Sequence, residues 1–146
     1  VPGLDGSGKM GKSEGEGNAV FLVDEPEVIR KKMMKAVTDS GPTQPNQEKP
    51  EVIQNLFTLL QLVAAQDTVQ HFEDAWNNCT IRYGDLKKQL AEDMIRFTAP
   101  IRERVKEFYN DTDRLHRILS LGAEKARASG GKTVNEVREI IGFRKF

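Results

Sequence analysis

The sequence predicts an all-α fold, a helical bundle preceded by a short glycine-rich loop. From residue 51 onward, apolar residues recur at intervals of three and four, which places them on one face of a helix. Capping residues, glycines and prolines separate these segments and are typical helix starts and stops. Before them, residues 6–13 combine three glycines, two lysines and two serines. This stretch predicts a loop rather than a regular element.

Length and composition fit one ordinary domain. The 146 residues include 22 basic and 22 acidic side chains, so any nucleic-acid contact must come from a local basic patch. Cys79 is the single cysteine, which excludes an intramolecular disulfide and favours a reducing, cytoplasmic location. No apolar run approaches the roughly 18 residues of a membrane helix, so we expect no membrane partner.

The glycine-rich stretch reads GSGKMGKS over residues 6–13. Glycines allow close backbone approach, which makes their N–H groups available to an anion. The ammonium groups of Lys9 and Lys12 lie three residues apart and can contact neighbouring oxygens of a polyphosphate. The stretch therefore predicts phosphate binding.

Two other interpretations of this stretch remain open. Read from Gly6, it matches the P-loop pattern G-x-x-x-x-G-K-S, which requires a strand before it and a helix directly after it. Pro2 and Gly3 disfavour the strand, and Gly15 and Gly17 disfavour the helix. A P-loop nucleotide hydrolase fragment is thus an alternative with poor context. The other alternative is an incidental loop on a stand-alone helical RNA-binding or protein-interaction module.

A first helix is expected at residues 24–37. Asp24 is the predicted cap, Pro26 lies in the first turn, and Glu27 follows three residues after the cap. Residues 38–50 contain three prolines and a glycine among short polar residues, which indicates a linker or ordered turn. We place a boundary within it, between a first part (residues 1–45) and a helical part (residues 46–146).

About five further helices are expected. Residues 51–65 are apolar over most of the circumference, as in the central helix of a bundle. The next helix is expected to begin at Asp67, and a long one at Gly84, kinked at Pro100. Asp111 or Thr112 caps another that ends at Gly130–Gly131, and residues 133–136 form a capping box for the last. The predicted buried face continues through the later helices at Ile101, Val105, Phe108, Tyr109, Leu115, Ile118, Leu119, Ala123, Val137, Ile140 and Ile141.

From Lys9 the loop reads KMGKS, which resembles the KMSKS signature of class I aminoacyl-tRNA synthetases, with Gly11 in place of the middle serine. Further segments resemble the tryptophanyl-tRNA synthetase family from its signature loop to its C-terminus. These segments are AVTDS at residues 36–40, KP at 49–50 before NL at 55–56, TAPIRER at 98–104 and GAEKA at 122–126. The likeness covers essentially the whole chain.

In that family a Rossmann-type catalytic domain activates tryptophan with ATP, and the signature loop closes over the triphosphate. The resemblance implies that Lys9 and Lys12 are catalytic cations that stabilise the departing pyrophosphate. Met10, Gly11 and Ser13 would complete the ATP and pyrophosphate site. Mg²⁺ would enter with ATP, and no metal site in the chain itself is expected. Gly11 should loosen the loop relative to serine.

The resemblance also implies that the helical part is an anticodon-binding domain for tRNA(Trp) in a homodimeric tryptophan–tRNA ligase. The residues that read the anticodon are not assigned. Basic and aromatic candidates are ordinary surface residues by sequence: Arg82, Tyr83, Lys87, Lys88, Arg102 and Arg104. The family's H-I-G-H-type motif and tryptophan pocket have no counterpart here. We therefore expect a C-terminal piece, inactive alone, that begins at the end of a Rossmann-type catalytic domain.

Overall fold

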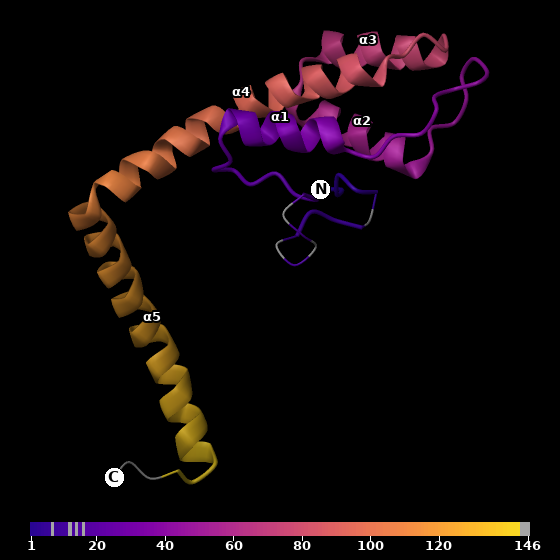
Figure 1. Cartoon of the computed structure of the whole chain (residues 1–146). Helices are drawn as coiled ribbons and strands as arrows, with labels where there is room; N and C mark the ends of the chain where they lie inside the picture. Colours follow the sequence, from indigo (N-terminus) through magenta and orange to yellow (C-terminus); the bar gives the residue numbers. More distant parts are fainter. Residues whose placement is uncertain (7, 12, 14, 16, 144–146) are drawn as a thin grey trace. The chain divides into compact units, whose positions relative to one another are not determined.

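The computed structural model of the chain describes residues 1–6, 8–11, 13, 15 and 17–143. Its helices are α1 (Pro26–Lys35), α2 (Glu51–Val63), α3 (Gln66–Asn77), α4 (Tyr83–Asn110) and α5 (Thr112–Ile140), shown in Figure 1. The described residues contain no strand, and one isolated bridge pairs Pro2 with Lys9. The all-α prediction is confirmed. None of the helices in the described part of the chain has the length and apolar character needed to cross a membrane.

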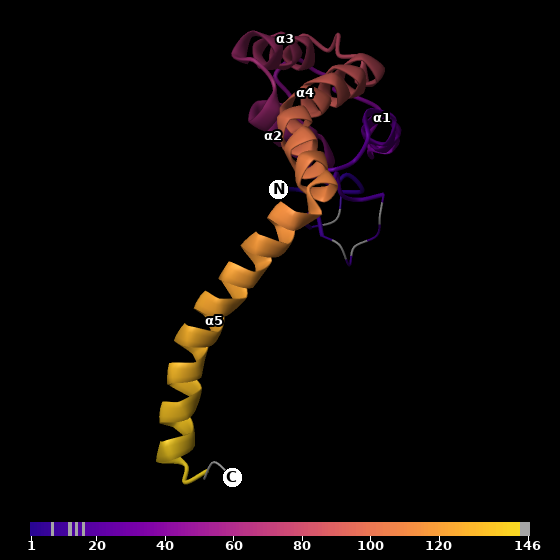
Figure 2. The ribbon, with the colours of Figure 1, turned by 90° about the vertical axis from the view of Figure 1, so that its left-hand side faces the viewer.

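The chain forms two compact units, Val1–Glu103 and Arg104–Phe146. The first unit contains α1, α2, α3 and most of α4, which lie together in both ribbon views (Figures 1 and 2). Its core includes residues from both sides of the expected boundary at 45/46, such as Leu4 and Met33 together with Phe57. The boundary at 45/46 stays a prediction, which separates a part with the loop from a helical part of different function.

The central element of the first unit is α2. It buries the apolar residues of one wide face, while Leu62 on another face is 55% exposed; the buried residues are Ile53, Leu56, Phe57, Leu59 and Leu60. The indole of Trp76 on α3 meets the Phe57 ring edge-on at a centroid distance of 6.4 Å. Its Nε1–H donates to the carbonyl oxygen of Gln47 at 2.7 Å, which ties α3 to the segment before α2. The predicted central position of this apolar helix is confirmed.

Three predicted helix starts are wrong by one or two residues. α1 has Glu25 as its N-cap, α3 has Ala65, and neither side chain makes a capping hydrogen bond; α4 begins at Tyr83. Asp24, the predicted cap of α1, accepts instead from the Phe21 N–H at 2.9 Å and pairs with Lys32 at 2.7 Å. The Asp24 carboxylate makes these two contacts instead of capping α1.

The second unit differs most from expectation. α5 is one continuous helix through Gly130 and Gly131, so the predicted break and second helix there are wrong. Asp111 caps it as predicted, accepting from the Arg114 N–H at 2.9 Å. No residue of α5 is buried. The buried face predicted for residues 101–109 is also wrong: Tyr109 is 74% exposed and the other three are half-buried. In the described part of the second unit, residues 104–143, no side chain of α5 is buried by another element.

Candidate functional site

The glycine-rich loop starts from a tight fold-back of the first residues. Lys9 and Pro2 form an isolated antiparallel β-bridge, and the Met10 N–H donates to the carbonyl oxygen of Val1 at 3.0 Å. Gly6 has φ +81°, a conformation that favours glycine, and a Cβ there would lie 2.7 Å from a methyl carbon of Val52. Glycine is therefore required at this turn both by backbone geometry and by the close approach of α2.

Both ends of the loop are held in the first unit. The Leu4 N–H donates to the carbonyl oxygen of Asn18 at 3.1 Å, so residues before and after the loop are paired. The Leu4 carbonyl accepts from the Val37 N–H at 2.9 Å, just after α1. Leu4 itself is buried in the core. The loop thus projects from a fixed base rather than from a free terminus.

The predicted phosphate ligands lie along this loop. Lys9 and Ser13 are exposed, and Met10 and Gly11 are half-buried. Lys12 lies outside the described residues. Within the described part of the chain, no strand precedes the loop, and the next helix begins only at Pro26. The P-loop alternative therefore lacks its required structural context, and the roles of the five site residues stay predictions.

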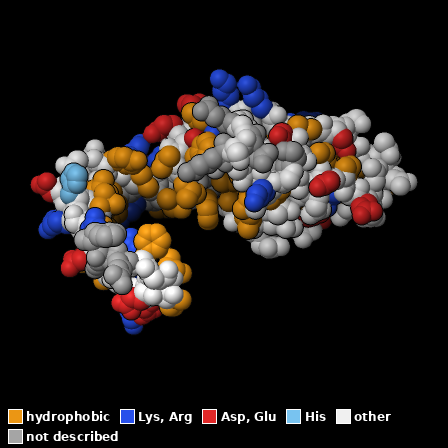
Figure 3. Space-filling model, turned by 90° about the horizontal axis from the view of Figure 1, so that it is seen from below, with side chains coloured by type: hydrophobic (Ala, Val, Ile, Leu, Met, Phe, Trp, Pro, Cys, Tyr) orange, Lys and Arg blue, Asp and Glu red, His pale blue; other side chains and the backbone are white. Residues whose placement is uncertain are grey.

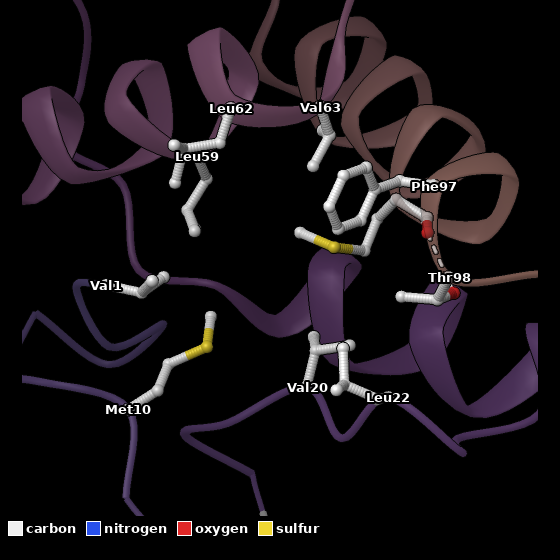
Figure 4. Close-up of a pocket in the computed structure, with 10 residues that line it drawn as sticks. Val1, Met10, Val20, Leu22, Leu59, Leu62, Val63, Phe97 and Thr98 are labelled. Atoms are coloured by element: carbon white, nitrogen blue, oxygen red, sulfur yellow. Dashed lines mark hydrogen bonds between the residues drawn. The ribbon is translucent and has the colours of Figure 1, made fainter. Parts of the chain in front are cut away.

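An apolar pocket of about 500 Å³ lies beside the loop, within the first unit. Figure 4 shows side chains from the loop, from α2 and from α4 facing this space. The residues that line it are Val1, Met10, Val20, Leu22, Leu59, Leu62, Val63, Met94, Phe97 and Thr98. The hydroxyl of Thr98 donates to the Met94 carbonyl at 2.9 Å. Such a lining suits apolar groups, not phosphate, and Met10 packs against the core here.

Two of the four basic residues on α1, Arg30 and Lys32, make structural contacts. Lys32 pairs with Asp24, donates to the carbonyl oxygen of Ala19 at 2.9 Å, and lies 4.6 Å from the centroid of the Phe21 ring. Arg30 donates to both carboxylate oxygens of Glu92 on α4, at 2.7 and 3.1 Å. This hydrogen bonding lowers the pKa of Glu92. Arg30 and Lys32 therefore fasten α1 to its neighbours.

Three of the surface candidates from the sequence also have structural contacts. The Tyr83 hydroxyl donates to Asp39, and burial together with this bond raises the tyrosine pKa. The ammonium of Lys87 lies 3.2 Å from the Thr38 hydroxyl, and burial lowers its pKa. Arg102 is buried and donates to the carbonyl oxygen of Asp24 at 3.0 Å. These three residues of α4 hold Asp24 and residues 38–39 against that helix.

No group of three or more His, Cys, Asp and Glu side chains that could hold a metal ion is found among the described residues.

The residue that sequence reasoning missed is Asn18, which is 3% exposed and forms hydrogen bonds with both Leu4 and Asp5. Leu4 and Asp5 lie 13 residues or more from Asn18 in the chain, so no local sequence signal marks these two contacts.

A sequence model of the protein family described as tRNA synthetases class I (W and Y), where W is tryptophan and Y is tyrosine, matches residues 1–99 of the chain. These residues include the loop and most of the first unit. The chain belongs to this family. Large hydrophobic side chains are exposed in both units, among them Leu62 and Ile140, and Figure 3 shows apolar groups on the face seen from below. The resemblance to tryptophanyl-tRNA synthetases is confirmed by curated relatives. A tryptophan–tRNA ligase of Porphyromonas gingivalis is 58% identical over 144 residues, and one of Helicobacter pylori is 42% identical over 145.

The chain is shorter than the relatives that it matches. The alignments take in 99% and 98% of this chain but only 43% of each relative, so the chain spans less than half of their length. A solved tryptophanyl-tRNA synthetase from Campylobacter jejuni matches in fold, with a TM-score of 0.74 and 24% identity over 97% of this chain and 44% of that one. A second structure of it, complexed with ADP and tryptophan, matches with the same TM-score at 25% identity.

Proposed function

We propose that this chain is the C-terminal part of a tryptophan–tRNA ligase. The full-length enzyme would activate tryptophan with ATP and Mg²⁺ and transfer it to tRNA(Trp). The observation that carries the proposal is the 58% identity to a relative of that name, which extends over 99% of the chain and includes the loop. We place the enzyme in the cytoplasm as a homodimer.

The loop would act on the leaving pyrophosphate. Negative charge develops on the bridging oxygen as the α-phosphate is transferred, so cations there stabilise the transition state more than the ground state. Lys9 and Lys12 would supply these cations, and Gly11 and Ser13 would donate hydrogen bonds. Met10, packed against the apolar pocket, would anchor the loop. The exposure of Lys9 and the fixed base of the loop support this assignment.

The helices would bind the tRNA. Bases of a single-stranded anticodon loop are generally read by stacking and by hydrogen bonds to their edges. Because the chain has no net charge, few phosphate contacts are expected. Each contributes a slope of roughly −0.7 to −0.9 in log affinity against log salt, so the overall salt dependence should be shallow.

The test uses the full-length protein with Lys12→Ala. This change should lower the rate of tryptophan-dependent ATP–pyrophosphate exchange by roughly two or three powers of ten, as for loss of one transition-state donor. Tryptophan affinity should barely change. Lys132→Ala, which removes an 80% exposed ammonium outside the loop, is the matched control and should exchange at the wild-type rate.

Two outcomes would contradict the proposal. Exchange that depends on tyrosine instead of tryptophan would keep the family but refute the substrate. A full-length protein without exchange for either amino acid would refute the activity. The chain of 146 residues alone should show no exchange, because the family's tryptophan pocket has no counterpart in it.

A further inference from the structure

Four large apolar side chains line the pocket beside the loop and are exposed, although each comes from a different segment of the first unit. They are Val1, Leu22, Leu62 on α2 and Phe97 on α4, which are 69%, 52%, 55% and 50% exposed. Figure 4 shows these side chains around one open space. Exposed apolar residues scattered singly are ordinary, whereas a contiguous apolar patch marks a surface that another element covers. The pocket therefore has the character of one half of an interface.

The lining disfavours a polar occupant. Among the described residues that line the pocket, only Thr98 has a polar side chain. Its hydroxyl donates to the Met94 carbonyl oxygen at 2.9 Å, so this group is already used within α4. Sites for small molecules usually combine an apolar lining with a few polar groups that orient the ligand. Because the described lining offers no free side chain of that kind, apolar side chains of a protein segment fit the pocket better than an amino acid or a nucleotide.

The start of the chain is fixed at this pocket. The Met10 N–H donates to the Val1 carbonyl oxygen at 3.0 Å, next to the antiparallel bridge between Pro2 and Lys9. Side chains of directly opposed residues in an antiparallel pair lie on the same face. Val1 and Met10 accordingly both line the pocket (Figure 4). In a longer protein, the residues that precede Val1 therefore begin at the edge of the pocket.

The relatives contain such additional chain. The alignments to two tryptophan–tRNA ligases take in 99% and 98% of this chain but 43% of each relative, so more than half of each relative lies outside the alignment. The proposed function places this remaining part before Val1. A segment that is joined covalently at the pocket acts at a high effective concentration, which a second copy in dilute solution does not reach. The preceding part is thus the favoured occupant.

We propose that, in the full-length protein, apolar side chains of the part that precedes Val1 fill this pocket. The contact buries Leu22, Leu62 and Phe97, because apolar surface is stabilised by removal from water. It joins the preceding part directly to α2 and α4, so the two parts of the protein meet in a packed interface. The inference rests on the proposed function, which makes this chain the C-terminal part of a longer protein.

The first test compares the reactivity of single cysteines with a maleimide in the 146-residue chain and in the full-length protein. Leu62→Cys places a thiol at the pocket, and Gln61→Cys places one at the neighbouring exposed position, which does not line the pocket. Both variants carry Cys79→Ser, because Cys79 is exposed and would also react. Peptide mass spectrometry follows each site separately.

In the 146-residue chain the two thiols should react at similar rates. In the full-length protein, Leu62→Cys should react about tenfold more slowly or less, because a covered site reacts only through local opening, while Gln61→Cys should keep its rate. Equal rates for Leu62→Cys in both proteins would overturn the proposal. Protection in the 146-residue chain that grows with its concentration would assign the pocket to a second copy and overturn the proposal as well.

The cysteine rates are measured without substrates, so they do not depend on enzymatic activity. A full-length protein that shows no ATP–pyrophosphate exchange would refute the proposed function. The protection of Leu62→Cys would still decide whether the preceding part covers the pocket.

The second test measures melting temperatures. Leu62→Glu puts a carboxylate at an exposed position of the 146-residue chain, so its melting temperature should stay close to that of the wild type. In the full-length protein the same carboxylate is buried without a partner, which is unfavourable and should lower the melting temperature by several degrees. Gln61→Glu adds the same charge at the neighbouring position and should leave both proteins unchanged. An equal shift for Leu62→Glu in the two proteins would mean that the pocket stays open and would overturn the proposal.

Discussion

The helices α2 and α5 are both amphipathic, yet they use their apolar residues in opposite ways. α2 is 13 residues long and buries five apolar side chains, whereas α5 is 29 residues long and buries none. Ile118, Leu121 and Ile140 on α5 are 50%, 53% and 83% exposed. The comparison teaches that an apolar face predicts a helix, but burial depends on whether another element lies opposite it. The first unit supplies such elements, whereas the described residues of the second unit, 104–143, leave every side chain of α5 unburied.

The largest expected effect follows from cutting the chain between the units. Residues 1–103 should fold alone and melt cooperatively, because they contain the core. Residues 104–146 should be mostly non-helical as a peptide, since isolated helices are marginal in water and each glycine of α5 costs about 1 kcal/mol relative to Ala. Circular dichroism with thermal melting checks both pieces. A peptide 104–146 that melts cooperatively at every concentration would remove the contrast.

A smaller effect is expected from single truncations within the whole chain. Trp76 is fully buried, so Trp76→Ala should lower the free energy of unfolding by about 3–5 kcal/mol through lost burial and an added cavity. Leu121→Ala on α5 should change it by less than about 0.5 kcal/mol, as for other surface positions. Guanidinium unfolding followed by circular dichroism gives both values. Equal losses would mean that the α5 face is covered in solution.

The smallest effect concerns two tyrosines at opposite ends of α4. The raised pKa of Tyr83 means that the unfolded chain releases this proton first, near pH 10, where tyrosine normally ionises. The free energy of unfolding should therefore fall as pH rises above about 10. Tyr83→Phe should flatten this fall. Tyr109→Phe, at a position 74% exposed, is the control and should follow the wild-type curve. Parallel curves for Tyr83→Phe and wild type would contradict the prediction.

The site was predictable only in part. Three glycines and two lysines in eight residues predict a phosphate loop without any tertiary information, and the structure shows that the Lys9 side chain is exposed. The contribution of Asn18 was not predictable, because it depends on hydrogen bonds to Leu4 and Asp5 across the loop. In the same way, the sequence marks Lys32 as one of several basic residues, and the fold pairs it with Asp24.

The sequence by itself determined which segments are helical and which helix is central, because periodicity and composition act within a few residues. It also determined that the loop is rich in glycine and cations. The tertiary structure alone decided the helix starts, where Asp24 pairs with Lys32 instead of capping α1. It likewise decided that α5 continues through Gly130 and Gly131 with its apolar face uncovered. The physical reason is that capping residues and helix-breaking glycines each change the free energy of a helix by only about 1 kcal/mol. Contacts made elsewhere in the fold readily outweigh a preference of that size.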